Sequence, residues 1–447
     1  MTTIYFKPLF LLMILTIVSC SQKEQNTEIV LFENATIITG NGSEVLENSD
    51  ILVVDGRIQK IGQNLSDTTG KTVDLKGKTI MPAIIASHSH VGILKGTECV
   101  PENYTKENIA SQLKKYQDYG ILHVMSMGSE RPLFYSADSL REQAENGTFG
   151  ARMLNAGRGF GVTNGAPPAN MAMDAVFRPT STDNIPVLMD SLKQLNPTIV
   201  KIWVDDFLGS VPKMDWEIIR TIIEEAHKRD LRVAAHVYYL SDLQQLVNDS
   251  IDIIAHSIRD KEIDDNTLAQ MKSRNIVYIP TLSLDKFSYV YGFEPEWIND
   301  DFFKESLEPG VYEMITSDDF KNSVKTGKNF ETNQKGFETA LKNLKRVFDA
   351  GILVSLGTDS GATPLRAQGF SEHLELELMT QAGLTPLQAI NVATQNAAQT
   401  LRIDQDYGTL EIGKVADFIV LNANPVDDIK NTKNISNVYK AGQEVNR

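Results

Sequence analysis

The sequence predicts an α/β fold: a (β/α)8 TIM barrel over residues 81–407, and a small β-domain built from residues 29–80 and 408–447. Eight apolar, β-branched runs alternate with stretches in which apolar residues recur three to four positions apart, as strands and helices alternate in such a barrel. A doubly wound open sheet is the rival architecture. No Gly-rich dinucleotide fingerprint follows the first run, which removes the commonest functional form of that rival.

Short β-branched runs separated by turn residues follow residue 28. Strands are expected at these runs, and Asn41-Gly42 and Asp55-Gly56 mark turns between them. Similar runs near the other end of the chain, at residues 416–421 and 435–439, are expected to join the same small domain. The four N-terminal runs are residues 29–32, 35–38, 50–54 and 57–61.

The expected barrel strands are residues 79–86, 121–127, 151–156, 198–204, 232–236, 251–256, 275–282 and 352–357. Helices are expected between several of them, for example over residues 216–228 and 336–350. Residues 285–330, after the seventh run, are rich in aromatic and acidic side chains. Because loops after barrel strands lie on the catalytic face, this segment is expected to form a lid or substrate wall. An irregular insertion that packs on neighbouring helices is the equal alternative.

The N-terminal 20 residues have the features of a signal peptide. The apolar run over residues 9–18 follows Lys7 and is too short to span a bilayer, which needs about 20 helical residues. It ends at Ile17-Val18-Ser19-Cys20, which resembles the lipobox of bacterial lipoproteins. The resemblance implies a lipidated Cys20, a tether over residues 21–28 and a place in the cell envelope, with the outer membrane and its periplasmic or surface face expected. A plain secretory signal is the alternative.

Composition limits the remaining function classes. The 447 residues are 42% hydrophobic and 23% charged, which is ordinary for a globular protein. The net charge of −15 argues against nucleic acid as a partner, because binding phosphates requires basic surface. Two cysteines are too few for a disulfide framework or a thiolate metal site.

Metal-ligating or charged side chains lie at or near the ends of five predicted strands. They are His88, His90, Lys201, His236, His256 and Asp359. The ends of parallel strands converge at one rim of a barrel, and the two histidines of His88-Ser89-His90 point to the same side of a strand. Imidazole and carboxylate groups suit borderline cations such as Zn²⁺. Singly, each histidine could be a hydrogen-bonded rim residue, Lys201 an ion-paired lysine and Asp359 a turn cap, but together they predict a metal site.

Three segments resemble motifs of the amidohydrolase superfamily of metal-dependent hydrolases, and they occur in the family's order. Residues 81–90, Met-Pro-Ala-Ile-Ile-Ala-Ser-His-Ser-His, resemble its opening signature. Residues 384–394 resemble the helix before the C-terminal return, and residues 408–417 resemble the return itself. The resemblance covers about residues 29–447, and its layout is most similar to imidazolonepropionase-like and prolidase-like members. It implies a distorted barrel flanked by a β-sandwich from both chain ends.

The resemblance also implies how metals would be held. His88 and His90 would bind the more buried metal. His236 and His256 would bind the second, so that two zinc ions are expected.

The remaining two residues would carry the chemistry. Lys201 resembles the lysine that some branches carboxylate with CO₂ to bridge two metals. Asp359 would ligate a metal, act as general base towards a metal-activated hydroxide, and pass the proton to the leaving amine. The sequence departs from the family pattern at three places while the ligand set is intact. Ala83 is a small change in a turn, Ser87 is expected to alter the support behind the ligands, and Met125-Ser126 indicates a shifted substrate specificity.

The predicted reaction is hydrolysis of an amide bond in dipeptides or N-acyl amino acids. Tyr238, two residues past His236, and Arg158, just after the third strand, are the predicted substrate-binding residues. A mononuclear hydrolase of a cyclic amide or lactone and a non-catalytic surface binding protein are the alternatives. The expected partners are a small or dipeptide-like substrate and the anchoring membrane, and a homo-oligomer is left open.

Overall fold

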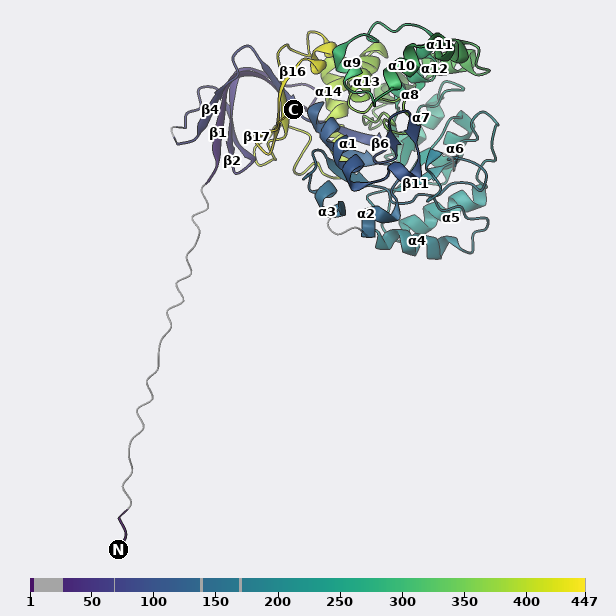
Figure 1. The fold of residues 1–447 in the computed structure, drawn as a ribbon, viewed down its shortest axis with the longest axis horizontal. Helices are drawn as coiled ribbons and strands as arrows, with labels where there is room; N and C mark the ends of the chain where they lie inside the picture. Colours follow the sequence, from purple (N-terminus) through teal and green to yellow (C-terminus); the bar gives the residue numbers. More distant parts are fainter. Residues whose placement is uncertain (4–26, 68, 137–139, 169–170, 447) are drawn as a thin grey trace.

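The computed structural model describes residues 1–3, 27–67, 69–136, 140–168 and 171–446 (Figure 1). The apolar run, the lipobox and Cys20 lie outside the described residues, so the anchor stays a prediction. No helix among the described residues is both long enough and apolar enough to cross a membrane. The body is a mixed α/β fold, in which a strand-rich part lies beside a larger part that carries most of the helices (Figure 1).

Both ends of the chain contribute to one eight-stranded sheet with the order β17-β16-β15-β5-β1-β2-β3, in which β4 pairs with β1. The N-terminal and C-terminal strands meet where β5 pairs antiparallel with β15, placing Ile80 opposite Val420. Phe32 packs edge-on against Phe418 and Tyr439 in the core of this part, with ring centroids 5.0 and 4.9 Å apart. The β-sandwich remains a prediction. The strands are β1 (Ile29–Ile38), β2 (Val45–Val54), β3 (Arg57–Gly62), β4 (Lys71–Asp74), β5 (Thr79–Pro82), β15 (Phe418–Leu421), β16 (Ile435–Lys440) and β17 (Gln443–Glu444).

The expected first barrel strand, residues 79–86, is in fact two strands. β5 ends at Pro82 and belongs to the sheet of the chain ends, whereas β6 starts at Ile84 and pairs in parallel with β9. The apolar sequence continues through both strands and therefore conceals the boundary.

Seven of the eight predicted runs contain parallel strands, arranged in two sheets of order β10-β9-β6 and β11-β12-β13-β14. Isolated parallel bridges join Phe160 to Ile202, Tyr278 to Val354 and Ser89 to Ser360. The eighth run, residues 352–357, contributes only the bridge at Val354. The strands are β6 (Ile84–Ser89), β9 (Ile121–Ser126), β10 (Arg152–Asn155), β11 (Val200–Trp203), β12 (Val233–His236), β13 (Ile253–Ala255) and β14 (Val277–Ile279), and a short hairpin consists of β7 (Leu94–Lys95) and β8 (Glu98–Cys99).

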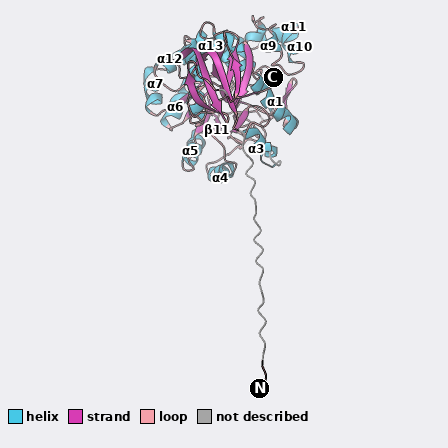
Figure 2. Ribbon diagram, turned by 90° about the vertical axis from the view of Figure 1, so that its left-hand side faces the viewer, coloured by secondary structure: helices cyan, strands magenta, loops and turns pink. Residues whose placement is uncertain are grey.

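Most of the helices lie in the larger part, and Figure 2, which looks onto the strand-rich part, shows helices around and behind its strands. The two helices expected from periodicity are confirmed as α5 (Trp216–His227) and α12 (Phe330–Asp349). Asp215 fixes the start of α5, because its side chain accepts the backbone N–H of Glu217. The others are α1 (Lys106–Asp118), α2 (Pro132–Ser136), α3 (Leu140–Glu145), α4 (Ile185–Gln194), α6 (Leu240–Asn248), α7 (Asp265–Ser273), α13 (Phe370–Gln381), α14 (Pro386–Ala393) and α15 (Gln395–Leu401).

The segment 285–330 is helical rather than irregular. Trp297 packs on Phe303 and on Phe370 of α13, with ring centroids 4.7 and 5.0 Å apart. This part of the segment therefore packs on a neighbouring helix, as the alternative to a lid predicted. Its elements are α8 (Leu282–Phe287), the 3₁₀ turn Val290–Gly292, α9 (Asp301–Lys304), α10 (Val311–Thr316) and α11 (Asp318–Lys325).

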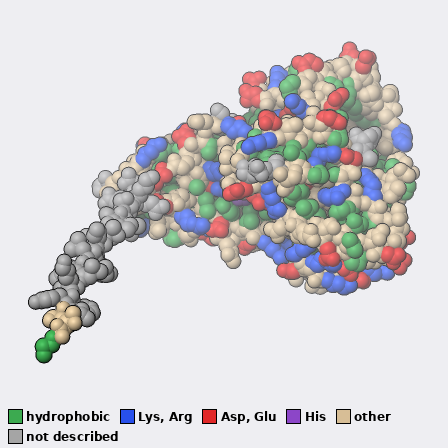
Figure 3. Space-filling view, turned by 60° about the horizontal axis from the view of Figure 1, so that its bottom comes forward, with side chains coloured by type: hydrophobic (Ala, Val, Ile, Leu, Met, Phe, Trp, Pro, Cys, Tyr) green, Lys and Arg blue, Asp and Glu red, His purple; other side chains and the backbone are tan. Residues whose placement is uncertain are grey.

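On the face shown in Figure 3, acidic and basic side chains are interspersed over the surface of the body. The exposed side chains of Arg57 and Asp406, for example, pair at 2.7 Å. Exposed pairs of this kind stabilise a protein by about 1 kcal/mol or less each, so the apolar core holds the fold together.

Candidate metal centre

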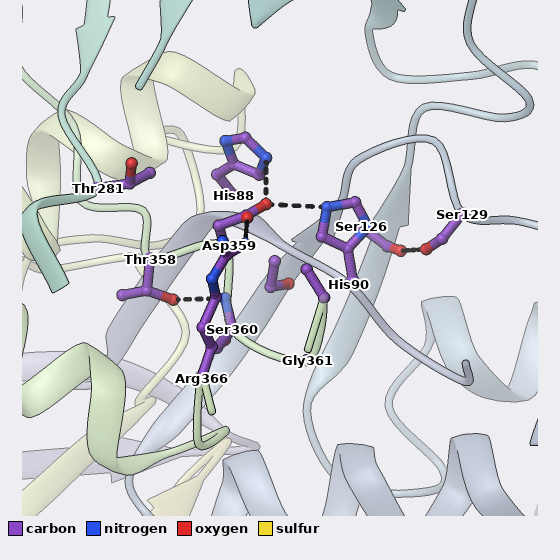
Figure 4. A network of polar contacts seen from close by, with 12 residues as sticks. His88, His90, Ser126, Ser129, Thr281, Thr358, Asp359, Ser360, Gly361 and Arg366 are labelled. Carbon is purple, nitrogen blue, oxygen red and sulfur yellow. Dashed lines mark hydrogen bonds and ion pairs between the residues drawn. The ribbon is translucent and has the colours of Figure 1, made fainter. Parts of the chain in front are cut away.

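Two histidines at the end of β6 and one aspartate from the loop after Val354 form a compact cluster (Figure 4). Asp359 Oδ1 lies 3.1 Å from His88 Nε2 and 2.9 Å from His90 Nε2. All three side chains are buried, and one ligand atom from each lies within 4.8 Å of the others. A single cation could therefore contact all three side chains.

The other two predicted histidine ligands continue this cluster. His256, which follows β13, has its ring centroid 4.6 Å from that of His88 and 4.1 Å from that of His236, the last residue of β12. Lys201 on β11 is 1% exposed and lines the same cavity. The structure thus brings all six predicted ligands to the wall of one cavity.

The residues present fit a bound metal. Nδ1 of His88, Nδ1 of His90 and Nζ of Lys201 are buried and have no hydrogen-bond partner among the described residues. Leaving polar atoms buried without a partner costs free energy, and so an ordered native structure rarely keeps several together. Imidazole nitrogens beside a carboxylate are a donor set for a borderline divalent ion such as Zn²⁺.

Electrostatics favour the neutral form of His88 and the charged form of Asp359. Burial, aided by the charge of Lys201, lowers the pKa of His88 to about 3. Burial tends to raise the pKa of Asp359, but Arg366 and His90 outweigh it and hold this pKa well below its usual range. Burial also lowers the pKa of Lys201 to about 7, so that much of this amine is neutral at neutral pH.

Three residues that the sequence analysis did not identify contact the predicted ligands. Asp205 Oδ2 lies 3.2 Å from Nε2 of His236, Thr281 Oγ1 lies 2.9 Å from Nδ1 of His256, and Arg366 donates to Oδ2 of Asp359. Asp205 was accessible from the sequence, because Lys201, Trp203 and Asp205 share the period-two pattern of a strand. Thr281 lies within the predicted run 275–282 but past the end of β14, and Arg366 lies in a loop; the sequence analysis singled out neither.

The cavity is about 400 Å³ and has walls of different character. Two cationic side chains, Arg259 and Arg366, line it together with Tyr238, one of the two predicted substrate-binding residues. The apolar part of the lining includes Pro167, Met171, Met173, Phe207 and Leu208.

The structure does not bring Arg158, the other predicted substrate-binding residue, to this cavity. Its Nε donates to the carbonyl of Ala175, and its guanidinium lies 4.2 Å from the ring centroid of Phe177. The chain turns at Gly157 and Gly159, both with positive φ, so the position after the third strand does not fix where the side chain points.

The segment 285–330 reaches the cavity near both of its ends. Ser288 lines the cavity, as do Leu284, just before the segment, and Asn329 near its end. The segment therefore contributes to the substrate wall there, while Trp297 packs against α13.

Gly357 gives His88 the space that it occupies. A Cβ at this position would lie 2.7 Å from Cβ of His88 and 2.5 Å from Cγ2 of Ile279. Gly357→Ala is therefore expected to lower the free energy of unfolding by about 1–3 kcal/mol, as overpacking does, and to weaken metal binding. Urea denaturation measures the first effect. Gly62→Ala is the control, because its nearest new contact would be Leu65 Cδ2 at 3.8 Å. An equal effect of both variants would contradict this interpretation.

Known proteins resemble this chain in sequence. The ochratoxinase of Aspergillus niger is 27% identical over 233 residues, which cover 51% of this chain but only 40% of the ochratoxinase. The 5-methylthioadenosine/S-adenosylhomocysteine deaminase of Bacillus cereus (strain B4264) is 25% identical over 455 residues, covering 93% of each protein.

Two solved structures share the fold. A Xaa-Pro dipeptidase with bound methionine in the active site superposes with a TM-score of 0.73 at 20% identity, covering 94% of this chain and 100% of that one. The A. niger ochratoxinase superposes with a TM-score of 0.70 at 19% identity, covering 94% and 95%. Residues 79–445 match the Amidohydrolase family. The chain therefore belongs to the amidohydrolase family, which confirms the predicted enzyme class at the level of a hydrolase.

Proposed function

We propose that this chain is a metal-dependent amidohydrolase that cleaves the amide bond of dipeptides or N-acyl amino acids, with a carboxylated Lys201 between two zinc ions. The observation that carries the proposal is the Lys201 amine, which is buried without a partner in a cavity lined by four histidines and Asp359. A free ammonium would repel two divalent ions at this position, whereas a carbamate would attract them. The name of one structural neighbour, a Xaa-Pro dipeptidase, agrees with a dipeptide substrate.

Lys201 is suited to this modification by its environment. The neutral amine attacks the carbon of CO₂, an N–C bond forms, and the amine proton leaves to solvent, which gives an anionic carbamate with two oxygen donors. A pKa of about 7 supplies the neutral amine. His88, His90, His236, His256 and Asp359 would complete the ligand set.

When bound, divalent ions supply Lewis acidity, which acidifies water and polarises a carbonyl group. Asp359 would accept the proton of the attacking water and return it to the nitrogen of the leaving amine. Arg366, which contacts the other oxygen of Asp359, would orient this carboxylate. Asp205 would orient the imidazole of His236 through their 3.2 Å contact.

Substrate recognition would rest on Arg259 and the apolar wall. The Arg259 guanidinium lies 4.6 Å from the ring centroid of Tyr238. One of its terminal nitrogens pairs with Asp285 at 3.0 Å, and the other donates to the carbonyl of Val237 at 2.8 Å. Its buried Nε has no partner among the described residues. A guanidinium with a free donor at a cavity wall suits the carboxylate of an amino-acid product. The apolar wall suits an apolar acyl group or side chain.

Arg259→Met is expected to raise the KM for N-acyl amino acids by about 10- to 100-fold, because a charge-assisted hydrogen bond of about 1.5–3 kcal/mol is lost. Substrates whose carboxylate is amidated should respond much less. Steady-state kinetics with both substrate types measure the difference. Arg158→Met is the matched control and should leave KM unchanged, since Arg158 is held at Ala175 and Phe177. A similar response of both substrate types to Arg259→Met would contradict a carboxylate contact.

A mononuclear hydrolase of a cyclic amide or lactone is the second candidate, because the compact cluster within 4.8 Å consists, among the described residues, of His88, His90 and Asp359. Elemental analysis of residues 21–447, purified from cells grown with zinc and bicarbonate, separates the two. Two metals per chain support the bridged site and one metal supports the mononuclear site. No metal after reconstitution would contradict both and favour a binding protein without catalysis.

We further propose that the two parallel sheets close into a (β/α)8 barrel. Three isolated bridges support closure. Phe160, which follows β10, bridges to Ile202 of β11; Tyr278 of β14 bridges to Val354; and Ser89 of β6 bridges to Ser360.

The predicted signal peptide and Cys20 support a lipid-anchored form in the cell envelope. Metabolic labelling with a radioactive fatty acid, compared between the natural chain and Cys20→Ala, tests the anchor.

A further inference from the structure

His256 is held by a threonine on the neighbouring strand end. Nδ1 of His256 and Oγ1 of Thr281 lie 2.9 Å apart, and both residues are almost fully buried. If Nδ1 donates its proton to this oxygen, the lone pair of Nε2 is free to bind a cation. We propose that Thr281 is a positioning residue that fixes the tautomer of His256, and that Glu375 holds Thr281 in place. The inference rests on the ligand role of His256 in the proposed function.

The backbone at Thr281 adopts a conformation that its own side chain disfavours. Its φ of 52° and ψ of 49° lie in the left-handed region, which is uncommon for any residue except glycine and most unfavourable for β-branched ones. Such a conformation persists only where the surrounding structure imposes it, and it is concentrated at functional sites. Something next to Thr281 must therefore hold the chain in this conformation.

Glu375 supplies that restraint. Its carboxylate, on α13 and fully buried, accepts the backbone N–H of Leu282 and of Ser283 at 2.7 Å each. These are the first two residues of α8 and follow Thr281 directly. Each carboxylate oxygen accepts one of these bonds, so the direction in which α8 starts is fixed, and with it the torsion angles of Thr281.

The same helix also presents the substrate wall. Leu284 of α8 lines the cavity, and Asp285 pairs with Arg259 at 3.0 Å. One buried carboxylate thus ties the orientation of a metal ligand to the position of the residues that face the substrate. If Glu375 only anchored the start of α8, its loss would leave the tautomer of His256 unchanged. The tautomer therefore tests the inference.

The test is ¹⁵N NMR of the histidine-labelled, metal-free chain at about pH 8, where imidazoles are neutral. The natural chain has seven histidines, so His256→Asn identifies the His256 signals. We expect the Nδ1–H tautomer in the natural chain and in Thr281→Ser, which keeps the hydroxyl. Thr281→Val, which keeps the branched shape but loses the oxygen, should show the Nε2–H tautomer. Retention of Nδ1–H in Thr281→Val would overturn the role of Thr281.

Zinc titration against a competing chelator gives the second readout. Thr281→Val should weaken the second zinc by about 10- to 100-fold, as loss of a partner behind a ligand typically does, and leave the first zinc unchanged. Equal zinc affinities in Thr281→Val and Thr281→Ser would overturn the link to the metal. If the natural chain binds no zinc, the proposed function fails, whereas the tautomer measurement still decides the inference.

The role of Glu375 has its own variants. Glu375→Ala should shift His256 towards the Nε2–H tautomer even though Thr281 is present, because α8 loses its restraint. Glu375→Gln keeps one oxygen acceptor and should fold with an intermediate tautomer ratio. An unchanged tautomer in Glu375→Gln and in any folded Glu375→Ala would overturn the role of Glu375.

Discussion

Lys201→Ala is expected to lower kcat by at least about 1,000-fold, and to reduce the bound metal from two ions per chain to one. The size follows from the loss of the bridging anion, since electrostatic groups of a preorganised site commonly contribute about 100- to 1,000-fold each and the second metal is lost as well. Steady-state kinetics and elemental analysis of the same preparation measure both effects. Loss of activity with two metals retained would contradict the bridge.

Chemical rescue makes this prediction specific to a carbamate. Alanine leaves a space where the Lys201 side chain was, and a short carboxylate such as acetate or propionate can enter it and supply two oxygen donors. Partial recovery of both activity and the second metal is expected, and it should saturate with carboxylate concentration. Lys228→Ala is the control, because Lys228 is an exposed residue paired with Glu225. Full activity of Lys201→Ala without added carboxylate would sink the proposal.

The strand-end residues show what a sequence can predict about such a site. His88 and His90 follow from the period of two, and Lys201, His236 and Asp359 follow from the convergence of parallel strand ends. These positions are set by backbone geometry that every strand shares. That these side chains line one cavity was therefore predictable from the sequence, whereas their role as metal ligands stays a prediction.

The errors and omissions come from loops and from a strand boundary that the hydrophobic pattern of the sequence does not reveal. Arg158 was placed near the substrate because it follows a strand, but local turns at two glycines carry it to Phe177. Arg366 reaches Asp359 from seven residues further along the chain, across a loop whose path depends on tertiary packing. The boundary between β5 and β6 also depends on tertiary structure. Both strands are buried, and the apolar run 79–86 continues through them, so the sequence does not show that they join different sheets.

Asp359→Asn is expected to reduce kcat by about 100- to 10,000-fold, the usual contribution of a general acid–base group, while the chain stays folded. The amide keeps the shape of the carboxyl but cannot accept the proton of water. It also leaves Arg366 without its anionic partner, so a modest loss of stability is expected. Kinetics with an N-acyl amino acid, together with metal analysis of the variant, measure the effect.

Comparison of Asp205→Asn with Asp359→Asn distinguishes a residue that acts through a metal ligand from one that takes part in proton transfer. Asp205 contacts His236 at 3.2 Å and would act only through that ligand, so its loss should cost about 10- to 100-fold in metal affinity and be offset by excess zinc. Excess zinc should not restore Asp359→Asn, because the proton acceptor is missing even when the metal sites are filled. If excess zinc restored the activity of Asp359→Asn, Asp359 would act as a metal ligand and not as a base. Amide turnover by the natural chain that disappears in Asp359→Asn would exclude a binding protein without catalysis, since a binding cavity has no need of a base.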